Sequence, residues 1–294
     1  MHKFKCTPKE KDLSFTFDQE SFDLKPFDVL QINDKLDCKI LNVGSEITAL
    51  DWCIDNPNSS NKAHSKNVQY FAFACKDLAF TMNSTTNSHE TILKSWKNKN
   101  IIFIGKLTNS ESKPNENKLE IFGIFDKHIC SINCLKWGVF NSNEKKNSIG
   151  YLLAASSNGF GYIYLVEDLL SETSDPSDEN KKVFSINAIN CYEPEFKITL
   201  KKRTCNHECV SCDWNQNNGA NQVCMGYADG SINIYDIKPD KNVIYASQVM
   251  SKSASSIDVL KWCKTNENPK HFYSLSFKEK VLSKKSNSNL KAIK

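Results

Sequence analysis

The amino-acid sequence predicts an all-β protein built from repeated sheets of short antiparallel strands. Four of its five tryptophans each close a short segment with the same pattern, residues 47–52, 132–137, 210–214 and 257–262. Apolar and polar residues alternate in these segments, which is typical of half-buried strands rather than helices. An initial Ile is followed three and five residues later by Leu and Trp. The third segment is expected to be one residue shorter.

The stretch after each tryptophan is also repeated. A polar loop comes first, at residues 54–67, 138–148, 215–221 and 264–270, and then a second apolar strand, at residues 68–75, 151–155, 223–227 and 272–275. In the two middle repeats, Asn158-Gly159 and Asp229-Gly230 precede third strands at residues 162–166 and 232–235. Gly supplies the positive φ of a two-residue hairpin turn. A fourth strand is expected at residues 243–247.

Four short antiparallel strands per repeat are typical of the blades of a β-propeller. The four tryptophans are 85, 77 and 48 residues apart, and only the last step approaches the ~40–45 residues of a plain blade. The longer steps predict polar insertions at residues 81–99, 108–118 and 171–182. We therefore expect an incomplete ring of about three full blades, with a fourth that stops after two strands near Phe277.

This interpretation divides the chain into three segments. Residues 1–40 lack the repeated pattern and are expected to form an N-terminal extension that docks on a surface. Residues 41–277 are expected to form the partial propeller. Residues 278–294 are rich in lysine and are expected to form a flexible basic tail.

Residues 206–236 resemble a WD repeat. They begin near His207, continue through a strand that ends in Trp214, turn at Asp229-Gly230 and end in Tyr235-Asp236. The resemblance implies that His207, Asp229 and Tyr235 share a buried hydrogen-bonded set that pins the blade. Tyr235 replaces the usual Trp, and the usual strand Ser or Thr near Met225 and Gly226 is missing. A weaker copy is His128 with Asn158 and Tyr164. The expected structural residues are His128, Asn158, His207, Asp229, Gly230, Tyr235, Asp236, Trp52, Trp137, Trp214 and Trp262.

Within the WD-repeat proteins, residues 47–53, 126–137 and 150–168 resemble the WD-repeat subunit of transcription factor IIIC, the assembly factor of RNA polymerase III. The resemblance covers about residues 40–277. It implies a nuclear scaffold that contacts other protein subunits and helps to assemble the complex on internal promoters, with no small-molecule substrate and no membrane partner. A generic cytoplasmic WD-repeat adaptor, such as a substrate receptor, is the alternative.

The charge of the chain argues against direct reading of DNA bases. The net charge is +4, and Arg203 is the single arginine. Arginine is the side chain that most often binds guanine edges in a bidentate way. We expect contact with DNA to be weak or indirect. The densest basic run is Lys201-Lys202-Arg203. Two interpretations of it remain: a contact with phosphate, or an ordinary surface loop.

Twelve cysteines raise the question of a metal site. Cys205, Cys209 and Cys212 have the C-x3-C-x2-C spacing of some iron–sulfur enzymes, and His207 lies among them. However, Cys209 and Cys212 fall in a strand that the repeat already explains, and no second Cys/His pair follows at zinc spacing. The six histidines are scattered, and no nucleophile or phosphate-binding motif occurs. We expect no cofactor, no metal and no enzymatic activity.

Overall fold

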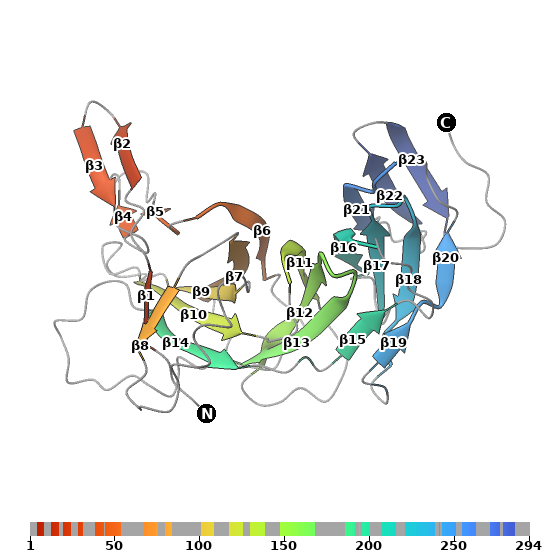
Figure 1. The fold of residues 1–294 in the computed structure, drawn as a ribbon, viewed down its shortest axis with the longest axis horizontal. Helices are drawn as coiled ribbons and strands as arrows, with labels where there is room; N and C mark the ends of the chain where they lie inside the picture. The colour runs from red at the N-terminus through yellow and green to blue at the C-terminus, as the bar shows by residue number, and fades with distance from the viewer. Residues whose placement is uncertain are drawn as a thin grey trace. The chain divides into compact units, whose positions relative to one another are not determined.

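The computed structural model describes residues 5–8, 13–17, 20–24, 29–31, 39–43, 45–53, 68–75, 80–83, 101–108, 118–125, 130–138, 148–167, 186–191, 194, 196–199, 207–215, 221–238, 241, 243–250, 255–262, 271–276 and 279–285. Within these ranges every regular element is a β-strand, which confirms the all-β prediction (Figure 1). The chain divides into two compact units, inside the segment that was expected to form one domain. Unit 1 holds residues 1–128 and 168–192, and unit 2 holds residues 129–167 and 193–294.

Unit 1 is organised around one five-stranded sheet in the order β14-β10-β9-β7-β6. The strands are β6 (Ile47–Trp52), β7 (Val68–Cys75), β9 (Ile101–Thr108), β10 (Lys118–Phe125) and β14 (Ile186–Cys191). All neighbours are antiparallel except β14, which runs parallel to β10. The stacked rings of Phe73 and Phe103, whose centroids are 5.0 Å apart, lie in its core.

Three two-stranded sheets complete the described part of unit 1. They are β1 (Lys5–Pro8) with β8 (Phe80–Asn83), β2 (Leu13–Phe17) with β3 (Glu20–Leu24), and β4 (Val29–Gln31) with β5 (Lys39–Leu41). The N-terminal segment thus contains strands of its own, and β1 pairs with a strand that overlaps the expected insertion at residues 81–99. Residues 171–182, expected to form another insertion, lie outside the described residues.

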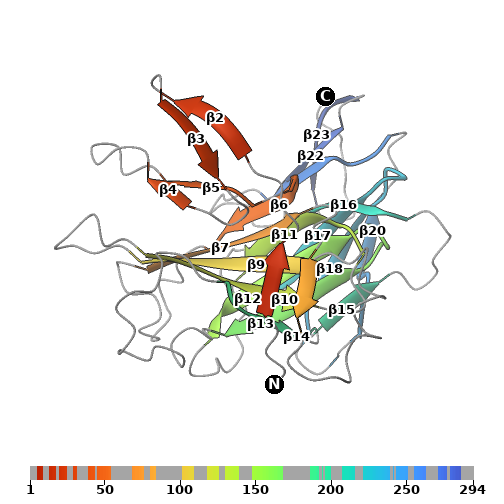
Figure 2. The ribbon, with the colours of Figure 1, turned by 60° about the vertical axis from the view of Figure 1, so that its left-hand side comes forward.

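Unit 2 consists of three sheets whose first strands contact each other in chain order (Figures 1 and 2). The first sheet is β11 (Ile132–Gly138), β12 (Ser148–Ser156), β13 (Gly161–Glu167), β15 (Phe196–Thr199) and β19 (Val243–Tyr245). The second is β16 (Cys209–Trp214), β17 (Gln222–Tyr227), β18 (Ile232–Asp236) and β20 (Gln248–Met250). The third is β21 (Val259–Trp262), β22 (His271–Ser276) and β23 (Glu279–Lys285).

A β-bulge recurs in the first strand of three sheets and aligns their sequences. The pairing register shifts at Thr48, Asn133 and Val210, each four residues before the tryptophan. A bulge places one extra residue opposite its partner strand and bends the strand. The alignment corrects the expectation of a shorter third segment, because Cys209 takes the place of Ile47 and Ile132. The repeated six-residue segment, which we call the frame, is therefore complete at residues 47–52, 132–137 and 209–214.

The strand expected at residues 243–247 exists in part, but it does not pair with the second sheet as expected. β19 covers residues 243–245 but pairs in parallel with β15 of the first sheet. The fourth strand of the second sheet is β20, which pairs with β18. A turn separates β19 from β20, and in it the backbone N–H and the hydroxyl of Ser247 both donate to the Ile234 carbonyl. Ile244 of β19 is buried in the core cluster that the first and second sheets share.

The last sheet and the hairpin turns also differ from expectation. β23 occupies residues 279–285, inside the expected tail, so this sheet has three strands rather than two. Gly159 and Gly230 have the positive φ that was predicted, 76° and 80°. Each turn, however, has three residues rather than two, as the hydrogen bonds between Ser156 and Phe160 and between Tyr227 and Ser231 show. A three-residue connection with glycine in the left-handed region is the next most common hairpin.

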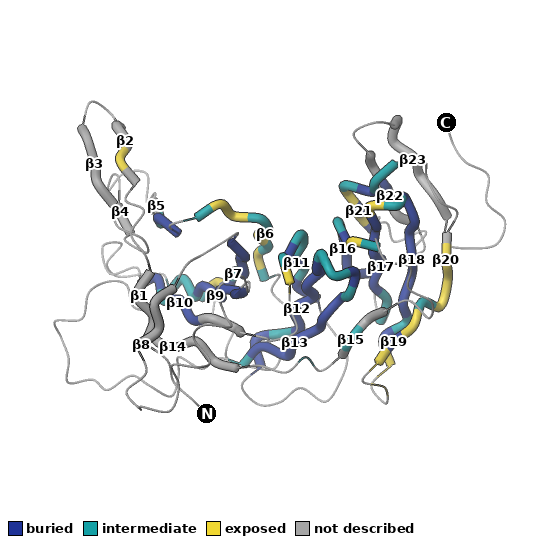
Figure 3. Tube along the Cα trace, viewed as in Figure 1, coloured by how far each residue is buried: buried dark blue, intermediate teal, exposed yellow. Residues whose placement is uncertain are grey.

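Successive sheets of unit 2 pack face to face. The second sheet packs one face, with Cys212, Trp214, Val223 and Met225, against residues of β12 and β13. Its opposite face packs against Leu260 and Trp262 of the third sheet, using Cys224, Ile232 and Ile234. We call the face that carries the frame's Leu or Cys and its Trp the backward face, and the opposite one the forward face. In both sheets the backward face packs on the preceding sheet. Figure 3 shows that β12, β13 and β18 are buried along most of their length.

Candidate interaction surface

The side chains of His207 and Asp229, which the WD-repeat resemblance implies to belong to one hydrogen-bonded set, lie close together. His207 precedes β16, Asp229 lies in the turn between β17 and β18, and its Oδ2 is 3.1 Å from His207 Nε2. The other carboxylate oxygen, Oδ1, accepts hydrogen bonds from the backbone N–H of Ser231 at 3.0 Å and from its hydroxyl at 2.6 Å. One carboxylate therefore holds the hairpin turn and the start of the first strand together.

Tyr235 belongs to the same region through a residue that sequence reasoning missed. Its hydroxyl lies 2.6 Å from the Tyr227 hydroxyl, and both side chains are buried. The Tyr227 ring in turn lies edge-on to the His207 imidazole, with centroids 6.2 Å apart. Burial raises the pKa of both phenols, so both remain protonated. Tyr227 on β17 thus contributes a hydroxyl on the strand where a Ser or Thr was expected and found missing.

Asn158 forms a different contact from the one expected. Its amide nitrogen donates to the Tyr162 hydroxyl at 3.0 Å, whereas Tyr164 was the expected partner. Its Oδ1 accepts from the Phe160 backbone N–H at 3.1 Å, so Asn158 stabilises its own turn as Asp229 does. His128 lies outside the described residues.

Asp236 closes the second sheet's hairpin at its far end. The side chain of Gln222, its cross-strand neighbour, donates to Asp236 Oδ1 at 2.6 Å. The expected set of residues is therefore distributed along the β17–β18 hairpin. Asp229, which contacts His207, and Gly230 lie at the turn, and Asp236 lies at the open end.

The apolar side chains of the frame are buried in unit 2 but exposed in unit 1. Trp137, Trp214 and Trp262 in unit 2 are 1–3% exposed. Trp214 packs so closely over Gly138 that a Cβ there would overlap the indole ring. In unit 1, by contrast, Trp52 is 50% exposed and Leu50 51% exposed. The predicted burial of Trp52 is therefore wrong for the described structure, in which its ring lies beside that of Phe71 on the neighbouring strand β7, with centroids 5.0 Å apart.

Cys209, Cys212 and Cys224 are buried, and the first two occupy frame positions, whereas Cys53 and Cys134 are only partly buried. Cys209 and Cys212 stand where other frames have Ile and Leu, and they are 0% and 1% exposed. Burial raises the pKa of both thiols, and likewise that of Cys224. Burial also raises the pKa of Cys75 to about 12. These thiols are thus protonated at neutral pH, whereas the thiolate is the form that binds metal or attacks a substrate.

The described residues contain no group of three or more His, Cys, Asp or Glu side chains placed to hold a metal ion. Cys205, the third cysteine of the C-x3-C-x2-C segment, and residues 201–203 lie outside the described ranges.

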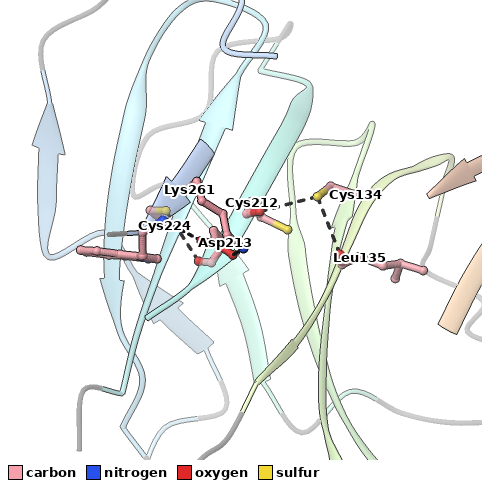
Figure 4. Close-up of polar contacts among 7 residues, drawn as sticks. Cys134, Leu135, Cys212, Asp213, Cys224 and Lys261 are labelled. Atoms are coloured by element: carbon pink, nitrogen blue, oxygen red, sulfur yellow. Dashed lines mark hydrogen bonds and ion pairs between the residues drawn. The ribbon is translucent and has the colours of Figure 1, made fainter. Parts of the chain in front are cut away.

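In every repeat, one charged residue lies between the frame's Leu or Cys and its Trp. Its charge alternates between negative and positive from one repeat to the next. The four are Asp51, Lys136, Asp213 and Lys261. Asp213 Oδ2 accepts a 2.6 Å hydrogen bond from the backbone N–H of Trp262, and Lys261 Nζ lies 3.4 Å from its Oδ1 (Figure 4). Burial raises the pKa of Asp213, while this N–H, Lys261 and the positive charge of Lys136 oppose the rise.

A second hydrogen bond joins the same two sheets. The Ser211 hydroxyl donates to the Ile257 carbonyl at 2.6 Å, and a side chain at Gly226 would overlap both residues. Between the first and second sheets, the Asn133 amide donates to Glu208 Oε1 at 2.9 Å and to the Cys209 carbonyl at 2.8 Å. The Cys134 thiol donates to the Cys212 carbonyl at 3.6 Å (Figure 4). Polar contacts thus fix the register between first strands at both junctions.

No protein-family model matches this sequence, and a comparison with curated proteins finds no match. In the described residues, no helix is long and apolar enough to cross a membrane.

Proposed function

We propose that this chain is a non-enzymatic protein-interaction scaffold of the WD-repeat propeller type, and a subunit of the transcription factor IIIC complex of RNA polymerase III. The observation that carries the proposal is the repeated junction in unit 2. Two successive junctions use the same frame on the same face, as radially repeated blades do. The His207–Asp229 pair at the start of a blade-like sheet supports the WD-repeat assignment.

The chemistry of the buried groups supports a scaffold rather than an enzyme. The thiols of Cys209, Cys212 and Cys224 have raised pKa values and fill core positions. The buried carboxylate of Asp213 bonds to a neighbouring strand and a lysine, which is a structural use of a charged group. Buried polar groups that join sheets stabilise the fold, and this is the use expected in a scaffold that binds other proteins through its surface.

The IIIC assignment rests on the sequence segments 47–53, 126–137 and 150–168, whose described residues include β6, most of β11 and the β12–β13 hairpin. Under this proposal the chain works in the nucleus. Its direct partners are other protein subunits of the complex, and it meets DNA only weakly or through them.

Affinity purification of the tagged full chain from nuclear extract, with quantitative mass spectrometry, tests the proposal. We expect the other IIIC subunits to be recovered in stoichiometric amounts, and tRNA genes to be enriched in chromatin bound to the tagged chain. A matched pair of variants serves as the control. Val249→Ser, on an exposed side chain, should preserve recovery, and Trp214→Ser, on a buried one, should reduce it. Recovery from the cytoplasm with ligase or vesicle-coat components, without IIIC subunits, would reject the assignment in favour of a generic adaptor.

A further inference from the structure

Two cysteine side chains meet where the first sheet of unit 2 packs on the second. Cys134 lies on β11 and Cys212 on β16, and the Cys134 thiol donates to the Cys212 carbonyl at 3.6 Å. A hydrogen bond also joins the two side chains, and it is the next cause, after burial, of the raised pKa of Cys212. Figure 4 shows both sulfur atoms in the space between the two strands. Two thiols in contact across a junction are the arrangement from which a disulfide forms.

The repeated frame explains why the two thiols meet at this junction. Cys134 is the third residue of its frame and points forward, whereas Cys212 is the fourth residue of the next frame and points backward. At the following junction the same two positions hold Ser211 and Leu260. There the Ser211 hydroxyl donates to the Ile257 carbonyl, so the third frame position reaches the next sheet at both junctions. The first junction is the one with a thiol at both positions.

The two thiols differ in their access to solvent. Cys134 is partly buried, whereas Cys212 is 1% exposed. The other thiols of the second sheet, those of Cys209 and Cys224, are buried and donate to carbonyls of their own sheet. An oxidant in solution therefore reaches Cys134 before it reaches Cys212.

We infer that Cys134 and Cys212 form a reversible disulfide under oxidising conditions, and that this bond locks the first sheet of unit 2 to the second. With a peroxide as the oxidant, the Cys134 sulfur attacks a peroxide oxygen and the O–O bond breaks, which gives Cys134 sulfenic acid and water. The Cys212 sulfur then attacks the Cys134 sulfur. The S–S bond forms, the S–O bond breaks, and the Cys212 proton leaves with hydroxide as a second water. Two electrons pass from the two thiols to the peroxide.

The burial of Cys212 affects the second step and not the first. Burial keeps its thiol protonated, and the thiolate is the nucleophile, so we expect its attack to be slower than the oxidation of Cys134. A dithiol reductant reverses the reaction by thiol–disulfide exchange. The inference rests on the packing of two sheets and not on the IIIC assignment.

Treatment of the purified, reduced full chain with hydrogen peroxide tests the inference. Free thiols are then alkylated, and the monomer is digested without reductant and analysed by mass spectrometry. We expect the peptides that contain Cys134 and Cys212 to be the main linked pair, and the link to disappear with dithiothreitol. Because the disulfide joins residues 78 positions apart, the melting temperature should rise by several degrees in the oxidised protein.

Three variants separate the roles of the two thiols. Cys212→Ala should stop at the Cys134 sulfenic acid, which dimedone labels, and should lose the rise in melting temperature. Cys134→Ser should give neither the sulfenic acid at this position nor the linked pair. The control Cys130→Ser removes an exposed thiol four residues from Cys134 and should leave the linkage unchanged. Circular dichroism checks that each protein is folded, and the peptide map of the wild type is decisive without the variants.

Four results would each overturn the inference: no oxidation of Cys134, oxidation of Cys134 without linkage to Cys212, linkage mainly to another cysteine, or linkage that appears only after urea is added. Because the protein here is pure, failure to form the disulfide leaves the co-purification test of the proposed function intact.

Discussion

Asp213 accepts a 2.6 Å hydrogen bond from the backbone N–H of Trp262, and this bond joins the first strands of two successive sheets. The carboxylate is nearly inaccessible to solvent, with a side chain 3% exposed, while its lysine partner is half exposed. A buried charged group costs free energy unless it is paired and hydrogen-bonded. Burial raises the pKa of Asp213, and the Trp262 N–H, Lys261 and the charge of Lys136 oppose this rise.

Asp213 gives the stability of the protein a specific pH dependence. Its pKa is higher in the folded than in the unfolded state, so the folded state binds more protons between the two values. The free energy of unfolding that Asp213 contributes therefore falls as pH rises from the usual aspartate value through the raised one. Asp213→Asn keeps an oxygen acceptor and removes the charge, so it should remove this fall. Urea unfolding of both proteins between about pH 4 and pH 7 measures it. A difference between them that is constant with pH, or that grows in favour of the wild type as pH rises, would contradict the assignment.

The Tyr227–Tyr235 pair should show strong coupling. Each single Tyr→Phe variant removes the hydrogen bond between the two buried hydroxyls, which costs about 1–3 kcal/mol. The double variant removes both hydroxyls, so its cost should be no more than that of either single variant. A double-mutant cycle from urea unfolding measures this coupling. Additive costs would show that the two hydroxyls do not depend on each other.

Gly230 is required by the backbone of the turn between β17 and β18. Its φ of 80° is strained for a β-branched residue. Gly230→Val should lower the free energy of unfolding by about 1–3 kcal/mol. Gly230→Asn is the matched control, because Asn adopts the left-handed region more readily, and it should cost less. Equal melting temperatures for the valine variant and the wild type would contradict the hairpin assignment.

The isolated chain should bind duplex DNA weakly and without sequence preference. It has a single arginine and a net charge of only +4. We expect dissociation constants of ~10⁻⁴–10⁻⁶ M near physiological salt, rising steeply with salt concentration. Fluorescence anisotropy with a promoter duplex and a scrambled duplex tests this. Nanomolar binding that prefers the promoter sequence would show a direct DNA-reading role.

The sequence predicted best where periodicity and glycine determine structure. The strand at residues 68–75 was predicted with the bounds it has in the structure, and the positive φ of Gly159 and Gly230 agrees with their place after Asn and Asp. The repeated frame was visible because buried strand faces require alternation. In the third repeat the alignment failed, since a buried thiol packs as a small apolar side chain and Cys209 and Cys212 replace Ile and Leu.

The wrong or missing predictions concern which strands and side chains contact each other, more than where the strands lie. Residues 243–245 form a strand, but it joins β15 in the neighbouring sheet through a long-range pairing that the local sequence pattern does not encode. The parallel pairing of β14 with β10 joins residues about 65 positions apart, which no local pattern encodes. Tyr227 was missed because a hydroxyl from a large aromatic residue does not resemble Ser or Thr in a motif. Trp52 was expected to match the other tryptophans because its frame is the same, yet its exposure depends on what covers the sheet.

Hydrogen exchange at the Trp262 backbone amide tests most directly the central claim that successive sheets stack through their first strands. This N–H lies on a sheet's first strand and bonds to a buried carboxylate of the preceding sheet. We expect slow exchange in the wild type and exchange about tenfold or more faster in Asp213→Ala, with a much smaller change at Phe103 on β9 of unit 1, whose strand pairs within its own sheet. A Trp262 amide that exchanges in the wild type as fast as an unprotected amide would contradict the stacking of the sheets.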